Sequence, residues 1–279
     1  MKIGLYCFSV LMILASCHSS RKEKTILNYE KNDLETALIY GKVKQVHLKV
    51  YVVEDSLSEA HPTKLLSQLI QNYTPDGYLK TVYQLNNKLD TVLKENYHYQ
   101  NGKLAEIVKV LEDSITIREE ITYSAAGFKE FQHIYRDSLL LEKSVYKTND
   151  YGFIAQKQVD NRRYVINYQY QYDNKGLLIC EKETDLHGIV YKQTVIEYDE
   201  SGLETNKKIQ NAAGKLLYYY FTTYDKDNLM VSKLFEDALT GSKDHYYYFK
   251  PDKKGNWREL IHRKNQQHYL KTIRKITYY

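Results

Sequence analysis

The sequence YQYDNKG at Tyr170–Gly176 contains the phrase on which the fold prediction rests. It returns as EYDESG at Glu197–Gly202 and as TYDKDN at Thr223–Asn228, 26 residues further on each time. The aspartate can accept hydrogen bonds from the backbone that follows it, and the closing Gly or Asn can adopt a positive φ. Each copy therefore predicts a strand that ends in tyrosine and then reverses in a tight turn.

The same turn position recurs along most of the chain. Its intervals are 24 to 27 residues, and a second polar turn signal lies near the middle of each interval. One unit is therefore two strands of about nine residues, and the chain is predicted to be all-β, a long antiparallel meander of about 16 to 17 strands in repeated hairpins. The turn residues are Gly77, Gly102, Gly127, Gly152, Gly176, Gly202, Asn228 and Gly255.

The sequence pattern does not decide whether the two edges of this sheet stay open or pair with each other. Strands such as Leu216–Phe221 and His245–Phe249 are apolar or aromatic on both faces. Three arrangements fit: a sheet curled around its own core, a sheet exposed on both faces, and an imperfect closed barrel. Open sheets rarely exceed about ten strands without curling, so we favour a strongly twisted or curled sheet.

The segment before the first repeat is less regular. Asn32–Leu38 is compatible with one short helix, and the alternating, β-branched Lys42–Val53 predicts the first strand. Thr63–Asn72 could form a helix or a strand. We predict a strand, because the segment occupies the place that precedes the turn in every later unit.

The N-terminus has the features of an export signal. Lys2 precedes an apolar run, Ile3–Leu14, which is too short to cross a bilayer. The quartet LASC at Leu14–Cys17 resembles the bacterial lipobox, and this resemblance implies lipid attachment at Cys17. An ordinary signal peptide with an incidental Cys17 is the alternative. The predicted organisation is a signal peptide at 1–16, a tether at 17–28 and one β domain at 29–279.

Cysteine and charge add two smaller expectations. Cys180 lies in an apolar stretch and is expected to be a small core residue. Residues 250–279 carry nine Lys or Arg against two acidic residues. These charges either protect an edge strand such as the one containing Arg274 and Lys275, or form a patch for an anionic partner.

Tyrosine is abundant, with 29 copies against 7 Phe and 1 Trp. Tyrosine rings can pack across strands and hold a sheet together, or can stack on sugars. Because the tyrosines share one phase in all units, we favour packing. The candidate ligand-facing residues are Trp257, Tyr218, Tyr220, Tyr246, Tyr248 and Arg274.

No catalytic or metal-binding pattern is recognisable. Asp173, Asp199 and Asp225 could be imagined as calcium ligands, but one carboxylate per hairpin supplies too few oxygens, so turn capping is favoured. The histidines are scattered, apart from the loose pair His262 and His268. We expect no enzyme activity, no metal, no cofactor and no nucleic-acid partner.

The phrase Tyr-x-Tyr-Asp-x-x-Gly-x-Leu, best seen at Tyr170–Leu178 and Ile196–Leu203, is similar to the YD repeat of the RHS family. The resemblance covers roughly Tyr73 to Tyr279. Gly255–Trp257 followed by Arg274–Tyr279 also looks like the closing unit of small secreted or lipid-anchored YD-repeat proteins of Gram-negative bacteria. Large family members wind such hairpins into shells around a toxin. That role is not carried over, because this chain is too short and its period of about 25 exceeds the family's roughly twenty.

Two functions follow as expectations. The first is a non-enzymatic lipoprotein of the cell envelope, in the outer membrane of a Gram-negative bacterium, that holds a protein partner or serves as a structural scaffold. The second is a surface lipoprotein that binds a glycan or polysaccharide. In both, the N-terminal lipid at Cys17 is the contact with the membrane.

Overall fold

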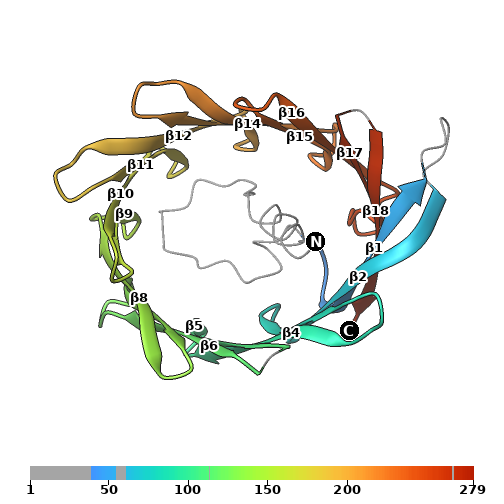
Figure 1. Ribbon diagram of the computed structural model, residues 1–279, viewed down its shortest axis with the longest axis horizontal. Helices are drawn as coiled ribbons and strands as arrows, with labels where there is room; N and C mark the ends of the chain where they lie inside the picture. The colour runs from blue at the N-terminus through green and yellow to red at the C-terminus, as the bar shows by residue number, and fades with distance from the viewer. Residues whose placement is uncertain (1–38, 55–60, 113, 266) are drawn as a thin grey trace.

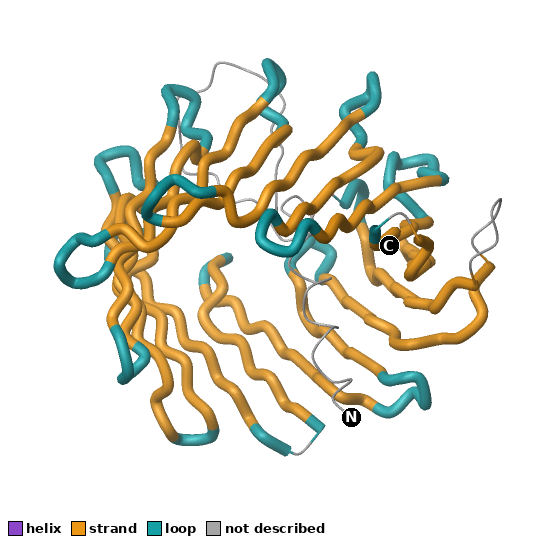
Figure 2. Tube along the Cα trace, turned by 45° about the horizontal axis from the view of Figure 1, so that its top comes forward, coloured by secondary structure: helices purple, strands orange, loops and turns teal. Residues whose placement is uncertain are grey.

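A computed structural model describes residues 39–54, 61–112, 114–265 and 267–279. They form one antiparallel sheet of 18 strands. Each strand pairs with its neighbours in the chain, and β1 pairs with β18, so the sheet closes into a barrel (Figure 1). Figure 2 shows the strands side by side, joined by short turns at the two rims.

The strands have the following bounds: β1 (Val43–Glu54), β2 (His61–Tyr73), β3 (Leu79–Leu85), β4 (Thr91–Gln100), β5 (Lys103–Leu111), β6 (Thr116–Tyr123), β7 (Lys129–Arg136), β8 (Leu139–Thr148), β9 (Ile154–Asp160), β10 (Val165–Tyr172), β11 (Leu178–Thr184), β12 (Val190–Tyr198), β13 (Glu204–Asn211), β14 (Leu216–Tyr224), β15 (Met230–Asp237), β16 (Ser242–Phe249), β17 (Glu259–Lys264) and β18 (Gln267–Tyr278). The described part of the chain contains no helix, and hence none that could span a bilayer.

The all-β antiparallel meander is confirmed, including the strand predicted at Thr63–Asn72, which lies within β2. The open, curled sheet is wrong. β1 and β18 pair from Val43 opposite Tyr278 to Val52 opposite Leu270, which leaves no free edge. The edge-strand explanation of the C-terminal charges is therefore wrong too. The helix predicted at 32–38, the signal peptide and Cys17 lie outside the described residues.

The predicted turn chemistry is present in the repeat. The Asp173 Oδ1 accepts hydrogen bonds from the backbone N–H groups of Lys175 and Leu177, both at 2.8 Å. Asn228 adopts a φ of 63°, as its place in the repeat requires. The aspartates are therefore turn residues, and among the described residues no group of three His, Cys, Asp or Glu side chains could hold a metal ion.

Successive units are joined at one rim by tyrosines that precede four of the turns. The Tyr198 hydroxyl donates to the backbone carbonyl of Leu178 at 2.9 Å, and the Tyr224 hydroxyl donates to that of Glu204 at 3.0 Å. Tyr123 and Tyr172 make the same bond to carbonyls 19 and 18 residues earlier. The regular interval between copies of the repeated phrase thus follows from the hydrogen bond that each of these tyrosines makes to the preceding hairpin.

The turn glycine is also in contact with the preceding unit. A Cβ added to Gly176 would lie 2.8 Å from the ring of Phe153, the residue that follows the previous turn. Phe153 stacks in turn on Tyr172, with 4.9 Å between ring centroids. The absence of a side chain at Gly176 therefore allows both the positive φ of 79° and the close approach of Phe153.

Gly176→Ala is expected to lower the free energy of unfolding by about 2 to 3 kcal/mol, and Gly214→Ala by about 1 kcal/mol. Both glycines have a positive φ, at 79° and 76°, but a Cβ at Gly214 meets nothing within 4 Å. The difference between the two losses in the free energy of unfolding therefore measures the clash of the added Cβ with Phe153. Urea unfolding followed by circular dichroism measures it, and equal losses in the two variants would contradict the rim packing.

Side chains alternate between the two faces of the sheet, and cross-strand partners share a face. One face carries most of the buried side chains, among them Leu48, Leu69, Tyr246 and Leu260. The other face carries exposed ones such as Phe249, which is 42% exposed. Side chains that point to the axis of a closed barrel converge, so we assign the buried set to the lumenal face and the other to the outer face.

The barrel is wide. At a strand spacing of about 4.8 Å, 18 strands make a ring roughly 86 Å around and about 27 Å across before any tilt is added. Barrels of this strand number are too wide for side chains from opposite walls to meet. The lumenal side chains of the described strands therefore form a concave surface and do not meet across the barrel.

The outer face is polar on nearly every strand. Transmembrane barrels instead carry an outward apolar band about 25 Å tall, in which each Lys or Arg near the midplane costs about 2 to 4 kcal/mol. Charges of both signs occur here and some are paired, as in Lys208 with Glu197 and Arg118 with Glu120. Further outward charged residues are Lys49, Lys94, Glu106, Lys143, Lys147, Lys182, Arg263, Lys271 and Lys275.

The closure of the barrel is held by Asn256, which is 1% exposed. Its Oδ1 accepts from the backbone N–H of Tyr40 at 2.8 Å, and its Nδ2 donates to the Tyr40 carbonyl and to the Tyr278 hydroxyl, both at 2.9 Å. The Tyr278 hydroxyl donates to Asp252. Asn256 thus joins the entry to β1, the turn before β17 and the end of β18.

Candidate functional site

The candidate ligand-facing residues come together on one part of the lumenal face. We call Tyr218, Tyr220, Phe235, Tyr246, Tyr248 and Trp257, on and beside β14 to β17, the aromatic wall. Phe235 lies between the first two tyrosines, with ring centroids 5.8 Å from Tyr218 and 5.0 Å from Tyr220. Tyr248 meets Trp257 edge to face at 5.6 Å. The rings form one continuous packed surface.

Lysines cover ring faces in this wall. The Nζ atoms of Lys207 and Lys233 lie 5.9 and 5.5 Å from the ring centroid of Tyr220, one from each neighbouring strand. Tyr246 and Tyr248 are buried, at 7% and 8% exposed. A ring whose faces are covered by ammonium groups or neighbouring rings cannot also stack on a sugar. The geometry therefore favours a wall that stabilises the sheet.

Arg274 supports the wall from within. It is 3% exposed, its Nε donates to the Trp257 carbonyl at 2.7 Å, and its guanidinium carbon lies 3.8 Å from the Trp257 ring centroid. Burial lowers the pKa of Arg274 to about 10. The structure thus places the Arg274 guanidinium against the Trp257 ring, buried on the lumenal face.

A second lumenal run of tyrosines lies on β8 and β10, and sequence reasoning did not single it out. Lys157 on β9 lies between Tyr146 and Tyr168, with its Nζ 5.7 and 5.5 Å from their ring centroids. Lys129 covers the Tyr146 ring at 4.5 Å, and burial lowers the pKa of Lys129 to about 8. The alternation Tyr168-x-Tyr170-x-Tyr172 was the signal that could have revealed this run.

The lumenal tyrosines titrate late. Burial raises the pKa of Tyr146, Tyr168 and Tyr248 to about 12, from an ordinary value of 10. In each case removal of the phenol from water is the largest cause, because the phenolate loses more hydration than the neutral group. The phenols remain neutral hydrogen-bonding groups at any pH found in a cell.

We expect the barrel to lose stability between pH 10 and pH 12. In that window the unfolded chain releases tyrosine protons while the folded barrel retains them, so the contribution is full below pH 10 and falls as pH rises to 12. Urea unfolding across this range, with phenolate absorbance recorded in parallel, measures the loss. A free energy of unfolding that stays constant through the window would contradict the burial of these rings.

One acid–base pair lies near the wall. The Nε2 of His262 is 2.7 Å from the Oδ1 of Asp244, and the His262 ring stacks on Tyr246 with centroids 4.5 Å apart. Burial is the largest cause of a lowered His262 pKa, which Asp244 partly offsets. The side chain of His268, whose spacing from His262 indicated no zinc site, is not described. Cys180 is buried, as expected of a small core residue.

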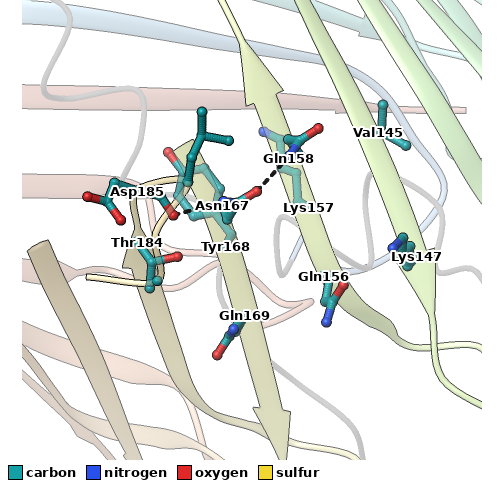
Figure 3. A pocket seen from close by; sticks show the side chains of 12 residues that line it. Val145, Lys147, Gln156, Lys157, Gln158, Asn167, Tyr168, Gln169, Thr184 and Asp185 are labelled. Atoms are coloured by element: carbon teal, nitrogen blue, oxygen red, sulfur yellow. Dashed lines mark hydrogen bonds between the residues drawn. The ribbon is translucent and has the colours of Figure 1, made fainter. Parts of the chain in front are cut away.

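A polar pocket of about 260 Å³ lies on the outer face of β8 to β11. Figure 3 shows the side chains of Gln156, Gln158, Asn167 and Gln169 on the neighbouring strands β9 and β10, with Lys147 on one side and Asp185 on the other. Val145 and the exposed Leu186 contribute apolar atoms. The pattern Gln-x-Gln in β9 and Asn-x-Gln-x-Gln in β10 was the sequence signal for this site, and it was missed.

Comparisons with known proteins give distant likenesses only. No family model and no curated protein matches the chain. A porin-like protein from Bacteroides uniformis ATCC 8492 is 12% identical with a TM-score of 0.45, over 85% of this chain and 98% of that one. A porin-like protein from Bacteroides vulgatus ATCC 8482 is 10% identical with a TM-score of 0.35, over 83% and 97%. TcdB2-TccC3 without its hypervariable C-terminal region is 12% identical with a TM-score of 0.36, over 75% of this chain and 14% of that one.

These findings overturn the resemblance to the YD-repeat family. No family model matches, and two matching structures of similar length are porin-like proteins. The physical reason lies in the phrase itself. A strand-end tyrosine, an aspartate that caps the turn and a positive-φ glycine are what each hairpin of this barrel needs, so turn chemistry alone accounts for the repeat.

Proposed function

We propose that this chain is a non-enzymatic, lipid-anchored protein of the cell envelope, in the outer membrane of a Gram-negative bacterium, whose barrel is a scaffold for a protein partner. The observation that carries the proposal is the polar outer face. A barrel with polar side chains outward on nearly every strand, and charged ones on most strands, is suited to water, so its contact with a membrane has to come from elsewhere. The quartet Leu14–Cys17 supplies that contact in the form of a lipid on Cys17.

The scaffold role is supported by the contacts of the lumenal and strand-end tyrosines, which are made within the barrel itself. Lysines and neighbouring rings cover the lumenal tyrosines, and the hydroxyls of the strand-end tyrosines bond to the backbone of the preceding unit. These groups hold the shape of the barrel, which leaves the outer face and the loops available for a partner.

Two experiments test the proposal. Labelling with radioactive palmitate is expected to mark the wild type and not Cys17→Ala. Affinity purification from detergent-solubilised envelopes, after crosslinking, is expected to return one partner in a fixed stoichiometry. If the wild type is not labelled, the proposed lipid anchor is wrong. If the protein is recovered without a partner, the proposed scaffold role is wrong.

Capture of a polysaccharide is the second candidate function. The aromatic wall does not favour it, because its ring faces are covered. The outer pocket favours it, because four amide side chains and a lysine meet there on an exposed surface. Retention of the purified protein on a polysaccharide affinity gel tests this function as a whole.

A further inference from the structure

The outer pocket is preorganised by a chain of side-chain hydrogen bonds. The Nε2 of Gln158 donates to the Oδ1 of Asn167 at 2.9 Å, and the Nδ2 of Asn167 donates to the backbone carbonyl of Asp185 at 3.0 Å. Asn167 is thereby fixed between β9 and the loop that follows β11. The pocket has one rigid side before any ligand enters.

Its other polar groups are available. Within the described part of the chain, the side chains of Gln156, Gln169 and Lys147 make no hydrogen bond or ion pair, and all three are exposed. Each glutamine presents one carbonyl acceptor and an NH₂ donor about 2 Å apart. Adjacent hydroxyls on a sugar ring, each both donor and acceptor, match such pairs.

The charge in the pocket is mainly positive. Lys157 also lines it but is held between the rings of Tyr146 and Tyr168 on the lumenal side. The Oδ1 of Asp185 already accepts from the backbone N–H groups of His187 and Ile189, both at 2.8 Å. Lys147 is therefore the cation that a ligand would meet, opposite a carboxylate whose Oδ1 is engaged by its own turn.

The size of the pocket sets the size of the ligand. Its volume of about 260 Å³ falls just below the roughly 300–1,000 Å³ of sites for drug-sized ligands. It fits one sugar ring, with Val145 and Leu186 available to the ring's C–H groups. The pocket opens on the outer face, so the rest of a polymer could continue into solvent.

We propose that this pocket binds one hexuronic acid unit of a polysaccharide. The amides of Gln156 and Gln169 bind vicinal hydroxyls, and the ammonium of Lys147 pairs with the sugar carboxylate. This inference rests on the second candidate function above and is separate from the scaffold role.

The test is a titration of the full-length protein in detergent micelles with methyl β-D-glucuronide and with its neutral counterpart, methyl β-D-glucoside, by isothermal calorimetry. Both are expected to bind saturably, with the glucuronide about tenfold tighter because its carboxylate pairs with a cation. Lys147→Met is expected to abolish that preference and leave glucoside binding unchanged. Gln169→Ala is expected to weaken both about fivefold.

Gln171→Ala is the matched control, because Gln171 lies on the same strand and outer face but outside the pocket. All substituted side chains are exposed, and thermal unfolding checks that each variant is folded. The inference is overturned if neither sugar saturates, or if Gln169→Ala and Gln171→Ala bind alike. If the wild type and Gln169→Ala are both retained on the polysaccharide gel, the glycan function stands and this site is overturned. If the wild type is not retained, both the glycan function and this site are overturned.

Discussion

Asn256→Ala is expected to lower the free energy of unfolding by about 2 to 3 kcal/mol, because it removes three hydrogen bonds of a buried side chain at about 1 kcal/mol each. The partners that lose Asn256 are the backbone N–H and C=O of Tyr40 and the hydroxyl of Tyr278, which keeps its hydrogen bond to Asp252. All three belong to segments that meet where the barrel closes. The loss should therefore appear as a weaker closure between β1 and β18, with faster hydrogen exchange at the amides of these two strands.

The control is Asn211→Ala. Asn211 also accepts two backbone hydrogen bonds, from Ala213 and Lys215, but in an exposed turn where water can replace them. Asn211→Ala is therefore expected to lower the free energy of unfolding by only about 1 kcal/mol. If the two variants lose the same amount in urea unfolding, Asn256 does not hold the closure.

Tyr248→Ala is expected to cost about 3 kcal/mol or more, the usual range for removal of a buried aromatic side chain. Tyr248 is 8% exposed and packs with Tyr246, Leu260 and Trp257 on the lumenal face. The adjacent Tyr247→Ala is the matched control, because the same change is made one residue away on the outer face. Tyr247 touches His245 and Phe249 at centroid distances of 6.1 and 6.3 Å.

The control is expected to cost about 1 kcal/mol, because Tyr247 is only half-buried and its cross-strand contact is the Arg263 guanidinium, 5.3 Å from its ring centroid. Chemical denaturation of the two variants side by side therefore tests the assignment of the two faces. A larger loss in Tyr247→Ala would reverse that assignment, and with it the conclusion that the barrel's outer face is the polar one.

Much of the fold follows from local patterns in the sequence. The positive-φ position in each turn identified eight reversals, among them the one at Asn228, because few residues tolerate that conformation. The strand in Thr63–Asn72 followed from the period alone. Local chemistry of this kind is visible in a single sequence because turn and strand are decided within a few residues.

Closure could not be predicted in the same way. It depends on contacts across more than 200 residues, such as Tyr40 with Asn256 and the pairing of β1 with β18. Nothing within one hairpin encodes the accumulated twist that brings those ends together. The charges of the last 30 residues were read as edge protection for the same reason, because the sheet was expected to have an edge.

The candidate site was predicted in part. The six ligand-facing candidates do meet on one face, with Arg274 packed against Trp257, since alternate residues of neighbouring strands must converge. Their coverage by Lys207 and Lys233 was not predictable, because it depends on which residues stand opposite one another across strands. The amide pocket was missed because Gln and Asn carry no catalytic or metal-binding signature.

The most direct test of the central claim is the behaviour of the barrel without its lipid. When residues 1–17 are replaced by a signal peptide that is cleaved without lipidation, we expect a folded protein in the soluble periplasmic fraction, with no detergent required. Circular dichroism and urea unfolding would confirm that the barrel is intact. A protein that stays in the membrane fraction after an alkaline carbonate wash would contradict the account, because a barrel with this outer face should have no other hold on a bilayer.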